Sequence, residues 1–118
     1  MLEAKLLTNP LELQQHELTD WGKVAAPIGD PVSHESGVLL FRREDKSSEM
    51  GMWQCTPGVW RCDVVKDEFC YFLSGKAIYR PDAGAEFTVT TGVAAAFPAG
   101  WSGTCEVLET VRKVYMVR

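Results

Sequence analysis

The clearest structural signal in the chain is the stretch Glu68-Phe69-Cys70-Tyr71-Phe72-Leu73-Ser74-Gly75, in which aromatic and apolar residues run up to a Ser-Gly pair. Residues of this kind are enriched in strands, and a Ser-Gly pair is a common turn signal. The stretch therefore predicts a strand over residues 68–73 that ends in a tight turn. A second strand is predicted directly after the turn, over residues 76–80.

The same pattern of strand-forming stretches and turn signals extends over most of the chain. Further strands are predicted at residues 38–41, 51–56, 59–65, 86–90, 94–97, 103–108 and 111–117. Turn signals such as Pro57-Gly58 and the loop 81–84 separate them. Many short strands with a turn signal roughly every 8 to 12 residues, and almost no helical period, predict an all-β sandwich or barrel.

The first 35 residues differ, because they are poor in strand signals. Asn9-Pro10 followed by Glu12 is compatible with one short helical turn through Gln15. An extended arm is the alternative, because residues that oppose regular structure follow, namely Pro27, Gly29, Pro31 and Ser33. Such an arm commonly docks on a neighbouring subunit or covers a sheet edge. We predict an N-terminal arm of residues 1–35 and a barrel of residues 36–118.

Length and composition indicate one globular domain. The chain has 118 residues, of which 46% are apolar and 24% charged, as is ordinary for a soluble protein with one core. The net charge of −4 offers no basic surface for nucleic acid. No secretion signal is evident, and no apolar run approaches the roughly 20 residues that cross a bilayer. We therefore expect a cytoplasmic protein with no membrane partner.

The four cysteines are expected to be reduced in that compartment. They are Cys55, Cys62, Cys70 and Cys105, and their spacing matches no paired zinc motif. We interpret them as small apolar core groups. The alternative is that Cys62 and Cys105 hold a soft metal ion together with Glu68.

Two parts of the chain resemble the two motifs of the cupin superfamily. In typical members the first motif ends in a Glu and a Gly, here Glu68 and Gly75, and the second contains Pro-x-Gly, here Pro98 and Gly100. The resemblance implies an all-β fold, a single double-stranded β-helix or jelly-roll barrel. It also implies that the carboxylate of Glu68 points into the barrel.

The histidines that hold metal in typical cupins are absent from these motifs. The His-x-His pair falls on other residue types in either of two spacings, Arg61 and Asp63 or Cys62 and Val64. The final motif histidine falls on Gly103, and the chain's two histidines, His16 and His34, lie in the predicted arm. A site of three histidines and one carboxylate cannot be built, so we expect no metal and no other cofactor.

Within the superfamily the chain looks like one small subgroup, related to the ureidoglycine aminohydrolases and the ethanolamine-utilisation cupins, many of which have no assigned activity. The similarity rests on residues 51–58, 67–70 and 98–103 and on the tail Glu109-x-x-Arg112-Lys113-x-Tyr115, and it covers roughly residues 35–118. Gly92-Val93 stands where the subgroup usually has Gly-Asp. The resemblance indicates the fold more closely than the activity, because one architecture hosts many functions.

Strand alternation predicts which side chains line the barrel. With Glu68 inward, Cys70 faces inward as well, and Cys105 follows from the last motif strand, with Trp101 at its mouth. Between residues 60 and 64 the register stays open, because a slip of one residue exchanges the two faces. The predicted ligand-binding residues are Trp60, Arg61, Cys62, Asp63, Cys70, Tyr79, Trp101 and Cys105. Trp53 is expected to pack in the core.

Glu68 is the predicted catalytic residue. A lone carboxylate in an apolar barrel costs several kcal/mol unless it is paired, protonated or bound to a cation. It would serve as a general acid or base, or as a ligand anchor. The alternative is a structural carboxylate bonded to Arg61, Tyr79 or a backbone amide. We expect Glu68→Gln to change ligand binding or activity more than folding. Glu109 and Lys113 share a strand face. They could form an ion pair with each other or across a subunit interface, and the alternative is a solvated pair of small worth at the sheet edge.

These observations favour a metal-free cupin that binds a small polar or planar metabolite. The first alternative is a metal-dependent enzyme that acts on a small nitrogenous metabolite, as the aminohydrolase resemblance implies. The second is a non-catalytic accessory protein. For each of these three possibilities we expect a homodimer that buries the N-terminal arm and an outward strand face between subunits.

Overall fold

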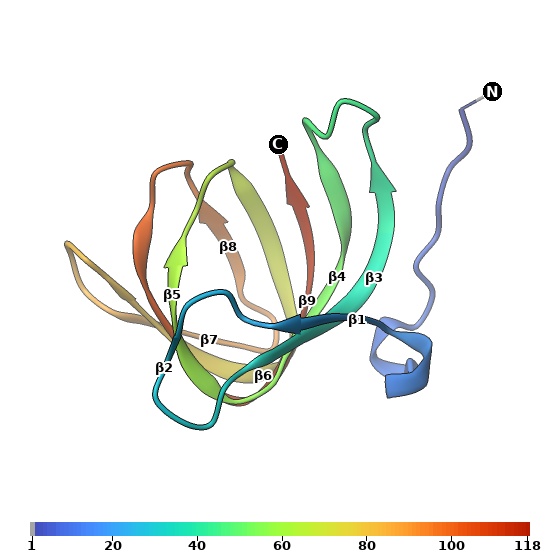
Figure 1. Cartoon of the computed structure of the whole chain (residues 1–118). Coiled ribbons are helices and arrows are strands. Elements are labelled where there is room, and N and C mark those ends of the chain that lie inside the picture. The colour runs from blue at the N-terminus through green and yellow to red at the C-terminus, as the bar shows by residue number, and fades with distance from the viewer. Residues whose placement is uncertain (1) are drawn as a thin grey trace.

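The computed structural model describes residues 2–118 as a curled antiparallel sheet (Figure 1). Met1, the first residue of the predicted arm, lies outside the described residues. The strands are β1 (Thr19–Lys23), β2 (Pro27–Ile28), β3 (His34–Arg42), β4 (Glu49–Cys55), β5 (Gly58–Asp63), β6 (Glu68–Pro81), β7 (Phe87–Thr90), β8 (Ala94–Phe97) and β9 (Ser102–Val117). The predicted all-β jelly-roll barrel is confirmed.

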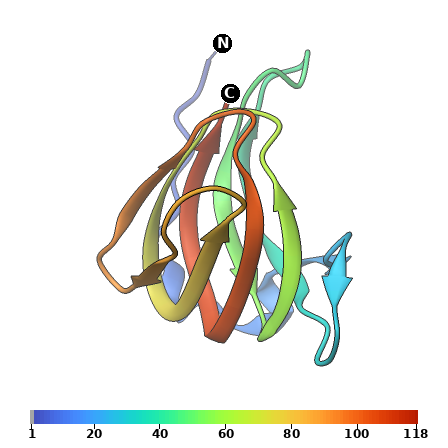
Figure 2. The same ribbon diagram turned by 90° about the vertical axis from the view of Figure 1, so that its left-hand side faces the viewer.

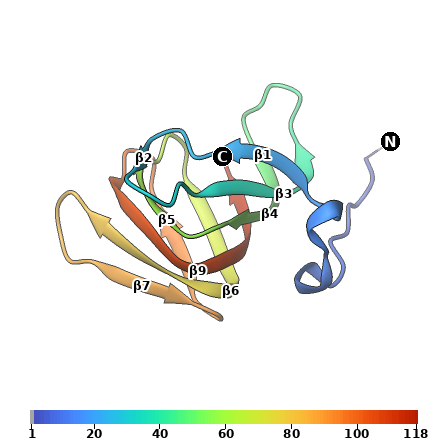
Figure 3. The same cartoon turned by 60° about the horizontal axis from the view of Figure 1, so that its bottom comes forward.

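Two long strands, β6 and β9, organise the barrel. They pair with each other, and β9 also pairs with β4 through residues 111–117 and with β5 through residues 102–107. The strand order is β1-β3-β4-β9-β5-β2, while β7 and β8 pair with β6. The turned views show these strands curving around a common interior (Figures 2 and 3).

The predicted turn at Ser74-Gly75 is wrong, because β6 runs through it without a break. Gly75 has a φ of +88°, and the β6–β9 register shifts on both sides of it. A Cβ on Gly75 would lie 2.2 Å from the carbonyl oxygen of Thr110. The glycine therefore produces a kink that lets β6 and β9 bend together. β9 bends together with β6 and stays paired with it, so the strands predicted at 103–108 and 111–117 form one strand, β9.

The predicted arm contains more regular structure than its sequence suggested. The helical turn expected near Asn9-Pro10 is present as η1 (Pro10–Glu12), and a second turn, η2 (Gln15–Glu17), follows. The absence of strands is a wrong prediction, since β1 pairs with the edge of β3 and β2 pairs with the edge of β5. Arg112 fastens the turns to the barrel by donating to the carbonyl oxygens of Pro10 and Leu13 at 2.7 and 2.8 Å.

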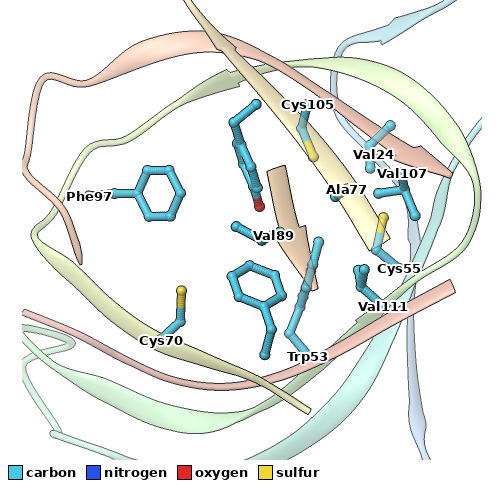
Figure 4. Packing of buried hydrophobic residues seen from close by; sticks show 12 residues of the cluster. Val24, Trp53, Cys55, Cys70, Ala77, Val89, Phe97, Cys105, Val107 and Val111 are labelled. Carbon is cyan, nitrogen blue, oxygen red and sulfur yellow. The ribbon is translucent and has the colours of Figure 1, made fainter. Parts of the chain in front are cut away.

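The interior is filled by apolar side chains from the curled sheet (Figure 4). Cys55, Cys70 and Cys105 are 0–1% exposed and belong to this core, as predicted, whereas Cys62 is half-buried. All four are free thiols. Within residues 2–118, no helix has the length and apolar character needed to span a membrane.

Candidate ligand-binding pocket

A cavity of about 310 Å³ opens into the barrel, at the lower end of the range for small-ligand sites. Its lining is dominated by aromatic rings, with a few charged groups among them. The aromatic residues are Trp21, Trp53, Trp60, Tyr79, Phe97 and Tyr115, the charged residues are Glu35, Glu49, Glu68 and Lys113, and Cys62, Val64 and Val117 complete the wall. These residues come from seven strands or strand ends, so the pocket exists only in the folded barrel.

An ion pair between Lys113 and Glu68 lies in the wall of this pocket. The Lys113 ammonium donates to Glu68 Oε2 at 2.7 Å, and the two side chains are 10% and 18% exposed. The same ammonium lies 4.4 Å from the ring centroid of Trp53 and 5.8 Å from that of Phe72. The alternative partners considered for Glu68 are therefore wrong, and Lys113 pairs with Glu68 rather than with Glu109 of its own chain.

Lys113 stays charged at neutral pH despite its burial. Burial alone would favour the neutral amine and lower its pKa. The charge of Glu68 outweighs that effect, together with the neighbouring thiol of Cys70, and holds the pKa of Lys113 above its ordinary value. The pocket thus contains a fixed ammonium that has donors besides the one used by Glu68.

Glu49 forms a second charged cluster on the strand that flanks β9 on the other side. Tyr115 donates its hydroxyl to Glu49 Oε2 at 2.5 Å, and Arg42 donates to Oε1 at 2.8 and 2.9 Å. Burial raises the pKa of Glu49, but the bonds from Tyr115 and Arg42 outweigh it, so the pKa is lowered overall. Burial and the contact with Glu49 raise the pKa of Tyr115. Glu49 and Glu68 both face Val117 across β9, so the two carboxylates flank one strand.

The indole groups of Trp53 and Trp60 form an adjacent wall. Trp53 Nε1 donates to Glu35 Oε2 at 2.7 Å. Trp60 packs edge-on against Trp53, with the ring centroids 6.1 Å apart. The buried Trp60 Nε1 has no hydrogen-bond partner among the described residues.

Trp21 reaches the pocket from β1 because of two local features. The β1–β3 register shifts between Asp20 and Gly22, which marks a bulge at Trp21. A Cβ on Gly37 of β3 would lie 2.7 Å from the Trp21 ring, so only a glycine there lets the indole pack on the sheet. His34 contacts Asp20 at 2.5 Å beside the bulge.

The lining does not fit the metal centre of typical cupins. The motif positions present Cys62 and Val64 to the pocket, and Gly103 has no side chain. Residues 2–118 contain no group of three His, Cys, Asp or Glu side chains placed to hold a metal ion. Burial raises the pKa of Cys62 to about 11 and that of Cys105 to about 12, so in the absence of a metal ion both are protonated at neutral pH. The cation beside Glu68 is instead the Lys113 ammonium.

The structure brings together some of the predicted site residues and not others. Trp60, Cys62, Glu68 and Tyr79 line the pocket. Three others are packed beside it: Cys70 and Cys105 lie in the core, and Trp101 packs edge-on against Phe97 at 5.2 Å. Arg61 and Asp63 lie outside the lining.

The sequence left two registers open between residues 60 and 64. In the structure, the side chains that face the pocket are those of Trp60, Cys62 and Val64. Arg61 forms ion pairs with Asp63 and Asp82 on the outer face. The hydrogen bonds that Arg61 donates to Asp82 are the main cause of its raised pKa, and burial acts in the opposite direction. These groups therefore belong to an exposed charge network.

Sequence reasoning did not identify the other lining residues as parts of a site: Trp21, Glu35, Glu49, Phe97, Lys113 and Tyr115. A signal for two of them exists, because alternation continued from Cys105 along β9 places Lys113 and Tyr115 inward. Trp21 and Glu35 lie in the segment interpreted as an arm. Trp53, expected in the core, is both a core residue and a pocket residue.

Comparisons with known proteins place the chain in a family and identify solved structures that it resembles. The family model for the EutQ-like cupin domain matches residues 42–115, which is more than half of the chain. A DUF861 family protein from Thermotoga maritima is 30% identical, with a TM-score of 0.53 over 54% of this chain and 73% of that one. No curated protein matches the chain.

Two further solved structures share the fold. A putative ethanolamine utilization protein Q from Salmonella typhimurium is 20% identical, with a TM-score of 0.64 over 81% of this chain and 76% of that one. A DUF861 family protein of unknown function from Pseudomonas syringae pv. tomato is 22% identical, with a TM-score of 0.76 over 86% of this chain and 44% of that one. At these identities the similarity concerns architecture alone.

Proposed function

The chain belongs to the EutQ-like cupin domain family, and from that premise we propose that its barrel binds a small polar or planar metabolite at the Lys113–Glu68 ion pair rather than at a metal ion. The observation that carries the proposal is this ion pair in the wall of an aromatic cavity of about 310 Å³. Well-packed apolar residues are often as stabilising as a buried ion pair, or more so. Polar groups placed at a cavity therefore support a binding role.

The ion pair offers a ligand two complementary contacts. The Lys113 ammonium has three N–H donors, and the bond to Glu68 Oε2 uses one of them. The Glu68 carboxylate keeps acceptor capacity for a ligand N–H or O–H group, or for a proton as a general base. The indole faces of Trp53 and Trp60 suit a planar group beside these contacts.

Ligand binding is tested by a thermal-shift screen of small polar metabolites. A ligand present at 100 times its Kd is expected to add about 2.7 kcal/mol to the free energy of unfolding. The matched control is Val64→Phe, which places a ring in the lining and is expected to remove the shift without unfolding the barrel. A shift of equal size in both proteins would mean that the ligand binds elsewhere, and a screen without any shift would favour a non-catalytic accessory role.

We also infer that the protein is a homodimer, because apolar side chains are exposed at the two places expected to meet a second subunit. The N-terminal residues run apart from the barrel, with Leu2 and Leu6 93% and 83% exposed (Figure 1). On the outer face of β6 and β9, Phe69, Tyr71 and Met116 are 56%, 43% and 38% exposed.

Four free thiols support a reducing, cytoplasmic compartment.

The dimer is tested by size-exclusion chromatography with light scattering. Twice the chain mass of 13.1 kDa gives an expected mass of about 26 kDa. Phe69→Lys is expected to shift the protein towards monomer by placing a charge in the apolar surface, with Val65→Lys as a control at another exposed apolar residue. A mass near 13 kDa for the unmodified chain would refute the homodimer.

A further inference from the structure

We propose that Glu35 forms a subsite for the ammonium group of a small organic cation, enclosed by the indole rings of Trp21, Trp53 and Trp60. This inference rests on the proposed function, because it assigns a ligand class to the same pocket. The four side chains all line the cavity. Glu35 and Trp21 precede the residues that the family model matches, whereas Trp53 and Trp60 lie within them.

The net charge of the pocket lining favours a cationic ligand. Three carboxylates line it, from Glu35, Glu49 and Glu68, against the one ammonium of Lys113. Arg42 compensates Glu49, and Lys113 compensates Glu68. Among residues 2–118, Glu35 has no cationic side chain within 4.0 Å. The pocket therefore has an excess of negative charge that is concentrated at Glu35.

The Glu35 carboxylate is placed to accept further hydrogen bonds. Glu35 is half-buried on β3, where it accepts the Trp53 N–H at its Oε2 atom. One hydrogen bond leaves most of the acceptor capacity of a carboxylate unused. A carboxylate that is partly withdrawn from water gains more from a cationic partner than an exposed one does. A ligand ammonium would supply that partner.

The same aromatic wall already contacts one ammonium group, that of Lys113. Lys113 lies 4.4 Å from the Trp53 ring centroid, within the range of a cation–π contact. Trp60 stands edge-on to Trp53 at 62°, and Trp21 closes the wall from β1. Indole is the aromatic group that attracts cations most strongly. Rings and a carboxylate together are the combination that recognises organic ammonium groups.

The size of the cavity limits the cation to a small one. At about 310 Å³ it accommodates an ammonium group attached to a single ring or a short chain. The donors of Lys113 lie in the same pocket, so a ligand that also carries an acceptor oxygen gains a second contact. The predicted class is therefore a small primary or methylated amine, with or without a hydroxyl or carbonyl group.

The subsite is tested with three compounds of one shape, benzylammonium, benzyl alcohol and benzoate, titrated at pH 7 and followed by tryptophan fluorescence. Benzylammonium is expected to bind about tenfold more tightly than benzyl alcohol, because a hydrogen bond to a charged group is the stronger one. Benzoate is expected to bind more weakly than either compound, because the excess negative charge repels it.

The deciding variant is Glu35→Gln, whose amide oxygen still accepts the Trp53 N–H. It is expected to bind benzylammonium about tenfold more weakly than the unmodified protein and benzyl alcohol equally well. Unchanged alcohol binding shows that the pocket has kept its shape. Glu86→Gln is the matched control, because it changes the net charge by the same amount at an exposed residue outside the pocket.

The outcomes separate this inference from the proposed function. If Glu35→Gln keeps the preference for benzylammonium, or if benzoate binds as tightly as benzylammonium, the cation subsite is wrong and the pocket remains a small-molecule site. If none of the three compounds binds while the thermal-shift screen yields a neutral or anionic ligand, the subsite is likewise wrong. Only the failure of both experiments overturns the proposed function as well.

Discussion

Glu68→Gln is expected to lower the free energy of unfolding by about 3 kcal/mol, because it leaves the Lys113 ammonium in the barrel without its carboxylate. The ammonium would keep only its contacts with aromatic rings and the weak dipole of the amide. From sequence alone, Glu68→Gln was expected to change ligand binding or activity more than folding. The structure leads us to expect a large loss of stability as well. The expectation from sequence took Glu68 to be a general acid or base or a ligand anchor, and it did not include a buried ammonium as its partner.

A double-mutant cycle separates the stranded charge from other effects of the substitution. Lys113→Met combined with Glu68→Gln is expected to recover most of the lost stability, since methionine fills similar volume and carries no charge. Urea unfolding followed by tryptophan fluorescence measures each variant. Glu109→Gln is the control, because Glu109 is an exposed residue of β9, the strand that carries Lys113. If Glu68→Gln were as stable as the unmodified protein, the ion pair would not be the partner that Lys113 depends on.

Gly75→Ala is expected to destabilise the barrel by about 3 kcal/mol or more, because β6 kinks at this residue against β9. The φ of +88° is unfavourable for alanine. In addition, the new methyl group would lie 2.2 Å from Thr110 O and 2.6 Å from Val111 Cα, and both are backbone atoms. Neither can move without separating the two central strands.

Gly84→Ala is the matched control for backbone strain. Gly84 has a φ of +108°, and a Cβ there would meet no atom within 4 Å. Its substitution is expected to cost about 1 to 2 kcal/mol from the positive φ alone. Thermal and urea unfolding measure the difference between the two variants. Equal costs would show that the close approach of β9 to Gly75 contributes nothing.

The barrel could be predicted from sequence because its strands and turns are local signals. Alternation and turn residues located most of the strands after Gly37 to within a few residues. The two errors there share a cause. At Gly75 the Ser-Gly pair is a local turn signal, and residues 109–110 lie between two predicted strands. Pairing of β6 with β9 makes both places part of a continuous strand. Such pairing depends on residues distant in sequence.

The pocket could be predicted less completely, for reasons of register and topology. Glu68 was found because its motif position is retained, whereas Lys113 was not identified, although alternation along β9 places it on the inward face. The register of β5 stayed open because only its pairing with β9 and β2 fixes which face turns inward. Trp21 and Glu35 carry no local signal of a site. They reach the pocket because β1 and β3 continue the curled sheet beyond β4.

The central claim is that the ammonium of Lys113 stands beside Glu68 where a typical cupin holds a metal ion. Anomalous diffraction from crystals of the purified protein, combined with a high-resolution map of the barrel interior, tests it most directly. The account predicts the Lys113 ammonium within hydrogen-bond distance of Glu68 and no anomalous peak in the pocket. A transition-metal ion bound at full occupancy by Glu68, with Lys113 displaced from it, would contradict the account.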